Sequence, residues 1–185
     1  IFFIAPDYLL FPRTYLEQFL NLGYECYFID NDKSIAMEKK VDLLISMFKE
    51  SLFFFFIDTS ADEINWSKMV SGFQKKYNDF VKIGVLFLKR KNDYEKQALE
   101  RFYLFEQGIS CGCIQLEYQK KNNFILMEKV LFANQGKGRR KNVRAVCFNG
   151  CNFVITTEHQ RIQGKLNDIS ISHFSITLDK NALKV

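Results

Sequence analysis

The chain has 185 residues, of which 48% are hydrophobic and 16% aromatic, with only two prolines. A chain of this length and composition can bury a hydrophobic core, which excludes the disordered, collagen-like and Pro-rich low-complexity classes. The charge is uneven: residues 1–134 carry 17 Lys and Arg against 18 Asp and Glu, whereas residues 135–185 carry nine against three. The last quarter of the chain is therefore the part expected to meet an anion.

The first 128 residues alternate short apolar runs with longer stretches of helical periodicity. The runs are continuous, as in strands that are buried on both faces of a parallel sheet, and they cover Ile1–Ala5, Cys26–Ile29, Leu52–Ile57, Ile83–Leu88 and Cys111–Leu116. Helices are predicted around 15–22 and 35–47, over 66–77, from Tyr94 to a stop at Gly108, and from about Asn122. Five β-α repeats predict an α/β doubly wound domain with a five-stranded parallel sheet over residues 1–134.

Residues 135–185 have a different character. The segment "NQGKG" is a small polar break, and Lys137, Arg139, Arg140, Lys141 and Arg144 follow within eight residues. Beyond them the chain is rich in Val, Ile, Phe and Thr with partial alternation, and Asn149–Gly150 and Gly164 are predicted turns. We expect a basic linker and a separate all-β unit of three strands, too short to close a barrel.

Membrane, metal and enzyme classes find little support in the sequence. The longest apolar run, Leu52–Ile57, is far shorter than the roughly 20 residues of a membrane-spanning helix, so no membrane insertion is expected. No signal peptide is visible, which predicts a cytoplasmic protein. The five cysteines lack the spacing of structural zinc sites, and no catalytic triad, carboxylate pair or phosphate-binding loop is present. We expect reduced thiols, no metal, no cofactor and no enzymatic activity.

The β-α repeats resemble the receiver domain of two-component response regulators. Asp58 ends the third strand, where that family carries its phosphoacceptor, and Asp7 follows the first strand, where it holds Mg²⁺. The resemblance is incomplete, because Pro6 or Tyr8 stands in place of the second acidic residue, and Leu88 or Lys89 and Glu117–Tyr118 replace the Ser or Thr and the Lys-Pro. Since little remains to neutralise a transferring phosphoryl group, we predict a degenerate receiver-like domain in which Asp58 serves packing, with Asp58 as phosphoacceptor the weaker alternative.

The C-terminal unit carries two short motifs: R-x-x-x-R at Arg140 and Arg144, preceded by Arg139, and D-x-S at Asp168 and Ser170. With these motifs it resembles the first half of a PilZ domain, a bacterial β-barrel receptor for cyclic di-GMP. His173 stands where the family continues its second motif with glycine, and an imidazole there can either crowd the base or stack on it.

The resemblance implies a cyclic di-GMP receptor that acts in bacterial signal transduction through a downstream protein, which the sequence does not identify. Arginine guanidinium groups can fork onto phosphate or guanine oxygens and can stack on a purine. We expect one strand to hold both Asp168 and Ser170, and the Asp168 carboxylate can accept from guanine N–H groups. The expected ligand-binding set is Arg139, Arg140, Arg144, Asp168, Ser170 and His173. A degenerate module that binds only proteins is the alternative, whereas the lack of a stacking platform argues against nucleic acid.

Overall fold

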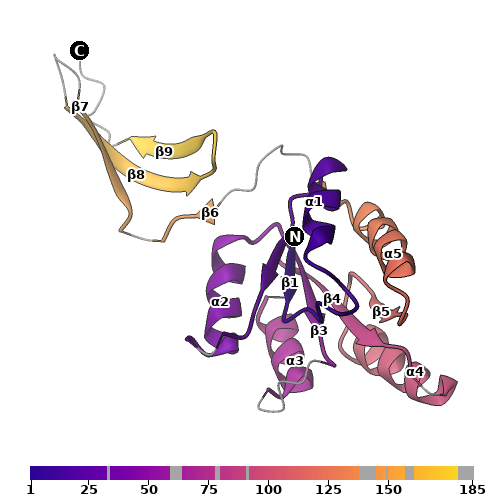
Figure 1. The fold of residues 1–185 in the computed structure, drawn as a ribbon. Helices are drawn as coiled ribbons and strands as arrows, with labels where there is room; N and C mark the ends of the chain where they lie inside the picture. Colours follow the sequence, from indigo (N-terminus) through magenta and orange to yellow (C-terminus); the bar gives the residue numbers. More distant parts are fainter. Residues whose placement is uncertain are drawn as a thin grey trace.

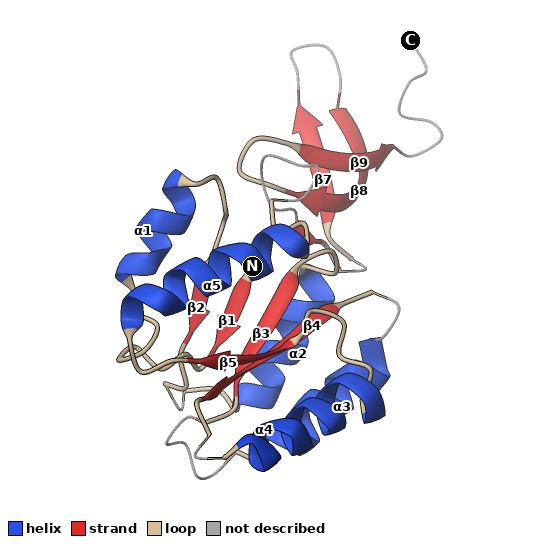
Figure 2. Cartoon of the chain, turned by 90° about the vertical axis from the view of Figure 1, so that its right-hand side faces the viewer, coloured by secondary structure: helices blue, strands red, loops and turns tan. Residues whose placement is uncertain are grey.

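The structure is a computed structural model, and it describes residues 1–32, 34–58, 64–77, 80–90, 92–137, 145–148, 150–156 and 161–178. In the first part, parallel strands lie in the order β2-β1-β3-β4-β5, and helices cover both faces of the sheet (Figures 1 and 2). The strands are β1 Phe2–Ile4, β2 Tyr27–Ile29, β3 Leu52–Phe56, β4 Lys82–Leu88 and β5 Cys113–Leu116. The predicted five-stranded parallel sheet is confirmed.

The helices follow the predicted alternation with the strands. They are α1 Thr14–Asn21, α2 Met37–Met47, α3 Trp66–Tyr77, α4 Asp93–Glu100 and α5 Lys120–Ala133. A π-helical turn, Arg101–Glu106, continues α4 where the sequence predicted one regular helix up to Gly108. The side chains of Tyr94 and Phe105, which were expected on its buried stripe, are 80% and 82% exposed.

Two hydrophobic clusters lie on opposite faces of this sheet. Alternate residues of β3 supply them, since Phe53 and Phe55 join the α2 and α3 side while Phe54 and Phe56 join the α1 and α5 side. The continuous run "LFFFF" is buried along its whole length, as expected for a strand covered on both faces. Gly84 in β4 lies opposite Phe54, and a Cβ there would be 2.4 Å from the Phe54 ring. The large Phe54 side chain therefore requires a glycine beside it.

The second part of the chain forms a separate antiparallel sheet (Figures 1 and 2). Its strands are β6 Ala145–Val146, β7 Asn152–Thr156, β8 Arg161–Ile169 and β9 Phe174–Leu178, with β6 and β7 along one edge of β8 and β9 along the other. Four strands are present where three were expected, because the two-residue β6 adds to the predicted set. A closed barrel is not seen in the part of the chain that the structure describes.

Gly164 corrects the sequence prediction. It was expected in a turn, but it lies inside β8 and pairs with Phe153 of β7 and Leu178 of β9. A Cβ on Gly164 would be 2.2 Å from the Thr177 carbonyl oxygen and 2.6 Å from the Phe153 ring. The glycine is thus needed for close packing under an aromatic ring and does not mark a change of chain direction.

Candidate functional site

Asp58 lies at the carboxyl edge of the parallel sheet, as predicted from its place after β3. One carboxylate oxygen accepts a hydrogen bond from the Leu88 backbone N–H at 2.6 Å, and the other accepts from the Arg90 guanidinium at 2.7 Å. The Arg90 and Asp58 side chains are only 25% and 17% exposed. The Asp58 carboxylate therefore joins the end of β3 to the end of β4 through two charge-assisted hydrogen bonds.

The neighbouring residues of this edge also have local partners. Asp7 accepts a hydrogen bond from the Leu9 N–H at 2.8 Å and so caps its own turn. The Lys89 ammonium group, which directly follows β4, lies 3.2 Å from the Glu117 carboxylate that follows β5. Asp7, Asp58 and Lys89 are thus each engaged by a local partner, and the packing role of Asp58 stays a prediction.

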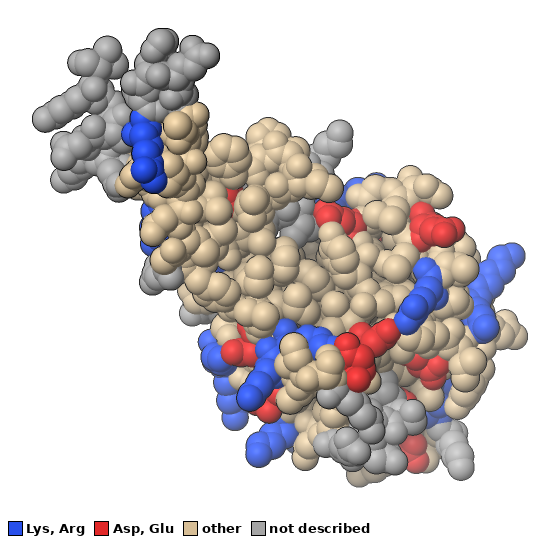
Figure 3. Space-filling view, turned by 60° about the vertical axis from the view of Figure 1, so that its left-hand side comes forward, with Lys and Arg blue, Asp and Glu red and all other residues tan. Residues whose placement is uncertain are grey.

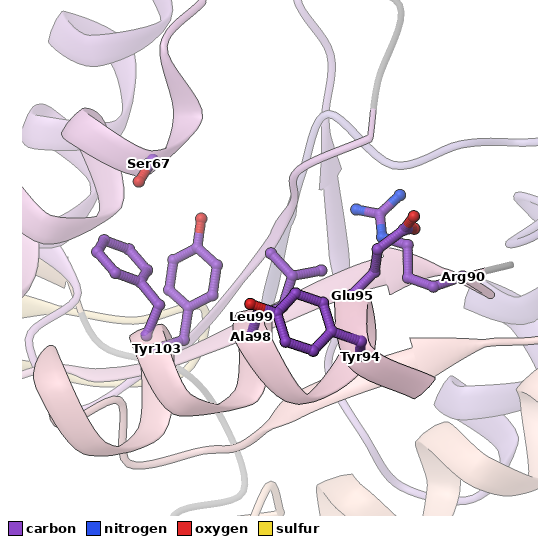
Figure 4. Close-up of a pocket in the computed structure, with 8 residues that line it drawn as sticks. Ser67, Arg90, Tyr94, Glu95, Ala98, Leu99 and Tyr103 are labelled. Atoms are coloured by element: carbon purple, nitrogen blue, oxygen red, sulfur yellow. The ribbon is translucent and has the colours of Figure 1, made fainter. Parts of the chain in front are cut away.

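A surface pocket of about 480 Å³ lies beside this edge, and sequence reasoning missed it (Figure 4). Arg90 lines one side, and the remaining lining residues come from α3, α4 and the π-helical turn: Ser67, Tyr94, Glu95, Ala98, Leu99, Phe102 and Tyr103. Tyr103 is buried and hydrogen-bonded to Ser67, and burial raises its pKa above the ordinary value. The only sequence signal was the cluster of aromatic residues at 102–105, which is also typical of a hydrophobic core.

The antiparallel sheet has one apolar and one polar face. Side chains alternate between faces along each strand, so the pairing of β6, β7 and β9 with β8 assigns every residue to one of them. The apolar face carries Ala145, Phe153, Ile155, Ile162, Gly164, Leu166, Ile169, Phe174, Ile176 and Leu178. The polar face carries Val146, Asn152, Val154, Thr156, Arg161, Gln163, Lys165, Asp168, Ser175 and Thr177. A water-soluble ligand is therefore expected on the polar face, where Asp168 lies.

Asp168 and Ser170 differ in how the structure holds them. Asp168 is in β8, beside a β-bulge, and pairs with Val146 on one side and Ser175 on the other. Ser170 was expected on the strand as well, but β8 ends at Ile169 and Ser170 begins the turn to β9. Its hydroxyl donates to the His173 carbonyl oxygen and accepts from the His173 N–H, both at 3.0 Å. The turn, rather than a strand, fixes the position of the Ser170 hydroxyl.

His173 completes this β8–β9 turn. Its carbonyl oxygen also accepts from the Ser170 N–H at 2.7 Å, and its Nδ1 lies 2.8 Å from the Ser172 hydroxyl. Among the described residues, the non-glycine positions with positive φ are Ala5 and Gln135, so His173 has an ordinary backbone conformation. The structure thus places no demand for glycine at this position, and the imidazole is exposed.

The basic linker begins and ends at defined points. Lys137 places its ammonium group 5.0 Å from the centre of the Tyr24 ring, a cation–π distance, and the Gly136 N–H bonds to the Leu131 carbonyl oxygen at the end of α5. The linker continues into β6 at Ala145, which pairs with Ile169. The predicted ligand residues Arg139, Arg140 and Arg144 lie outside the described residues.

The described surface of the larger domain carries charges of both signs. On the face that Figure 3 presents, Lys and Arg side chains alternate with Asp and Glu over the described part of this domain. Ion pairs in this domain include Arg13 with Asp30 at 2.7 Å and Lys76 with Asp42 at 2.6 Å. The excess of formal positive charge in the sequence lies in residues 135–185.

Comparisons with known proteins give no match: no family model, curated protein or solved structure is similar to this chain. In the described part of the chain, every helix is too short or too polar to cross a lipid bilayer. Within the same residues, His, Cys, Asp and Glu side chains do not gather in groups of three or more that could hold a metal ion.

Proposed function

We propose that the chain is a signalling receptor for cyclic di-GMP, with the ligand held between the arginines of the linker and the polar face of the antiparallel sheet. The observation that carries the proposal is the position of Asp168. It lies in β8 on the polar face, paired with Val146 of β6, and β6 is the strand through which the arginine-rich linker enters the sheet. Arg144 is bonded directly to Ala145, so the sequence order brings a guanidinium group to the strand that pairs with Asp168.

The chemistry of this arrangement suits a cyclic dinucleotide. Two phosphodiester charges need cations with several donors, which Arg140 and Arg144 can supply, and the guanine N1–H and N2–H groups need an acceptor such as the Asp168 carboxylate. Ser170 contributes less than its motif implies, because its hydroxyl is engaged with the His173 backbone. The exposed imidazole of His173 is available for stacking on a base.

Calorimetric titration of the full chain with cyclic di-GMP tests the proposal, with GTP and a short oligonucleotide as competing anions. Charge-assisted hydrogen bonds contribute about 1.5–3 kcal/mol each. The double variant Arg140→Ala/Arg144→Ala should therefore bind about 10²–10⁴-fold more weakly. The matched control is Lys120→Ala/Lys121→Ala, which removes the same charge from exposed positions on α5 and should keep the affinity of the natural chain.

The results separate three readings. The receptor is supported if the chain binds cyclic di-GMP but neither GTP nor the oligonucleotide, and if this binding is lost in the arginine variant and kept in the lysine variant. Equal loss in both variants indicates a general charge effect and contradicts the proposed site. Binding of the oligonucleotide with similar affinity indicates a nucleic-acid backbone as the partner.

The alternative is a module that acts only through contacts with other proteins. The engagement of the Ser170 hydroxyl within its own turn favours this alternative, since it removes one of the polar groups that the D-x-S motif would offer to a ligand. Absence of any heat with cyclic di-GMP at high concentration, in a preparation whose fold is intact, would favour the protein-binding module.

A further inference from the structure

Two cysteines flank the loop between β6 and β7. Cys147 directly follows β6, and its N–H donates to the Asn167 carbonyl oxygen at 2.8 Å. Cys151 directly precedes β7, and its carbonyl oxygen accepts from the Leu166 N–H at 2.9 Å. Both cysteines are thus bonded to consecutive residues along the same edge of β8, although three residues separate them in the chain.

The two thiols lie close to one another. Cys147 and Cys151 are bonded to the adjacent residues Asn167 and Leu166 of β8, and the Cys151 thiol, after desolvation, is the next cause that raises the pKa of Cys147. Both side chains are partly exposed and reduced. Positions opposite adjacent residues of a strand are offset by only one residue rise, about 3.3 Å, along the strand direction, which is within the Cα separation that a disulfide spans.

The other close pair in the sequence provides a contrast. Cys111 belongs to the hydrophobic cluster on the α1 and α5 side of the parallel sheet, whereas Cys113 packs against the cluster on the opposite side. Burial raises the pKa of Cys113 to about 12, and desolvation raises the pKa of Cys147 as well, so the contrast between the two pairs lies in their geometry. Closeness in sequence therefore does not bring Cys111 and Cys113 together.

We propose that Cys147 and Cys151 form a reversible intramolecular disulfide, a thiol-modification site in the antiparallel sheet. The oxidant is a small-molecule disulfide. One cysteine thiolate attacks a sulfur of the oxidant, the S–S bond of the oxidant breaks, and its first half leaves as a thiol after taking a proton. The second cysteine then attacks the mixed disulfide and releases the other half, so two protein S–H groups are oxidised and one small disulfide is reduced to two thiols.

The bridge has a structural consequence for the linker. In the described residues, β6 is held to the sheet by only two residue pairs, Ala145 with Ile169 and Val146 with Asp168. A disulfide from Cys147 to Cys151 joins the end of β6 covalently to the start of β7, which has five pairs with β8. Oxidation would therefore secure the point at which the arginine-rich linker enters the sheet.

Peptide mapping of the full chain tests the bridge. The protein is incubated with oxidised glutathione at about pH 8, where thiolates are more abundant, quenched with acid, alkylated in denaturant and digested with trypsin. Cleavage after Arg144 and Arg161 leaves residues 145–161 as one peptide that contains both cysteines and no other. We expect this peptide to carry no alkyl group and to weigh two hydrogen atoms less than its reduced, unalkylated form. After reduction with dithiothreitol it should become alkylated at both cysteines.

The same digest contains its own control. Cleavage after Arg101 and Lys120 yields residues 102–120 with Cys111 and Cys113, and this peptide should keep both alkyl groups. In the variant Cys151→Ser, Cys147 should carry either an alkyl group or one glutathione, without a bridge. The proposal is overturned if peptide 145–161 of the natural chain remains doubly alkylated, accumulates glutathione adducts without closing, or is cross-linked to another peptide.

Discussion

Asn123 is completely buried in α5, and its replacement by alanine should destabilise the parallel-sheet domain strongly. Its Oδ1 accepts from the Glu117 N–H at 2.8 Å, and its Nδ2 donates to the carbonyl oxygens of Glu117 at 2.8 Å and Leu10 at 3.0 Å. One amide group thus joins the start of α5, the end of β5 and the loop after β1.

The size of the loss follows from the groups left behind. A buried backbone group without its hydrogen bond costs about 1–3 kcal/mol. Glu117 is only partly buried, so water can replace some of the lost bonds there, while the Leu10 carbonyl oxygen has less access to water. Alanine is also the better helix former by about half a kcal/mol. We expect Asn123→Ala to lower the free energy of unfolding by about 2–4 kcal/mol.

Urea unfolding followed by fluorescence measures this change, because the single tryptophan, Trp66, is buried in the same domain. The matched control is Asn122→Ala, the same substitution at the exposed neighbouring position of α5, which should leave the stability within about 0.5 kcal/mol. If Asn123→Ala and Asn122→Ala have equal midpoints, the amide bonds do not stabilise the domain and the reasoning is refuted.

Two further predictions concern the same domain. Gly84→Ala places a Cβ 2.4 Å from the Phe54 ring and should lower the free energy of unfolding by about 1–3 kcal/mol through overpacking. Gly72→Ala, in open space on α3, should raise it by about 0.5–1 kcal/mol. Shifts of the two urea midpoints in the same direction would contradict this prediction. The Lys76 ammonium group and, to a smaller extent, the Tyr77 hydroxyl lower the pKa of Asp42 below its ordinary value of 3.8. The stability that this pair contributes is therefore present above pH 3.8 and is lost as pH falls through the depressed pKa. The natural chain should exceed Asp42→Asn in stability near pH 5 and lose that advantage toward pH 2, and a difference independent of pH would argue against the ion pair.

Much of the first domain could be predicted because its signals are local. The run "LFFFF" has enough apolar surface for both faces of a strand, and the helical spacing of Trp66, Val70 and Phe73 gave α3 its bounds. The π-helical turn at 101–106 was not predicted, since its extra residue per turn moves Phe105 away from the stripe that a regular helix would bury. The exposure of the Phe105 side chain thus depends on the backbone hydrogen-bond pattern of this turn, which residue type alone does not indicate.

The antiparallel sheet and the candidate site depend on pairings between distant residues. Gly164 is a residue type common in turns, but the Phe153 side chain of another strand packs over it and determines its role. A bulge between Leu166 and Asp168 shifts the alternation, so both Leu166 and Ile169 face the apolar side. The motif spacing placed Asp168 correctly on β8 but extended the strand to Ser170, because the sequence could not indicate where the turn begins.

The two fixed ends of the linker set an upper limit on how far the two sheets can separate. Lys137 is held at Tyr24 and Ala145 at Ile169, so residues 138–144 bridge the gap with a contour of no more than about 30 Å. The length of the chain alone keeps the two attachment points within this distance of each other. For any ligand that contacts both sheets, the second contact would therefore form within the same complex, and it would add affinity without a second diffusional encounter.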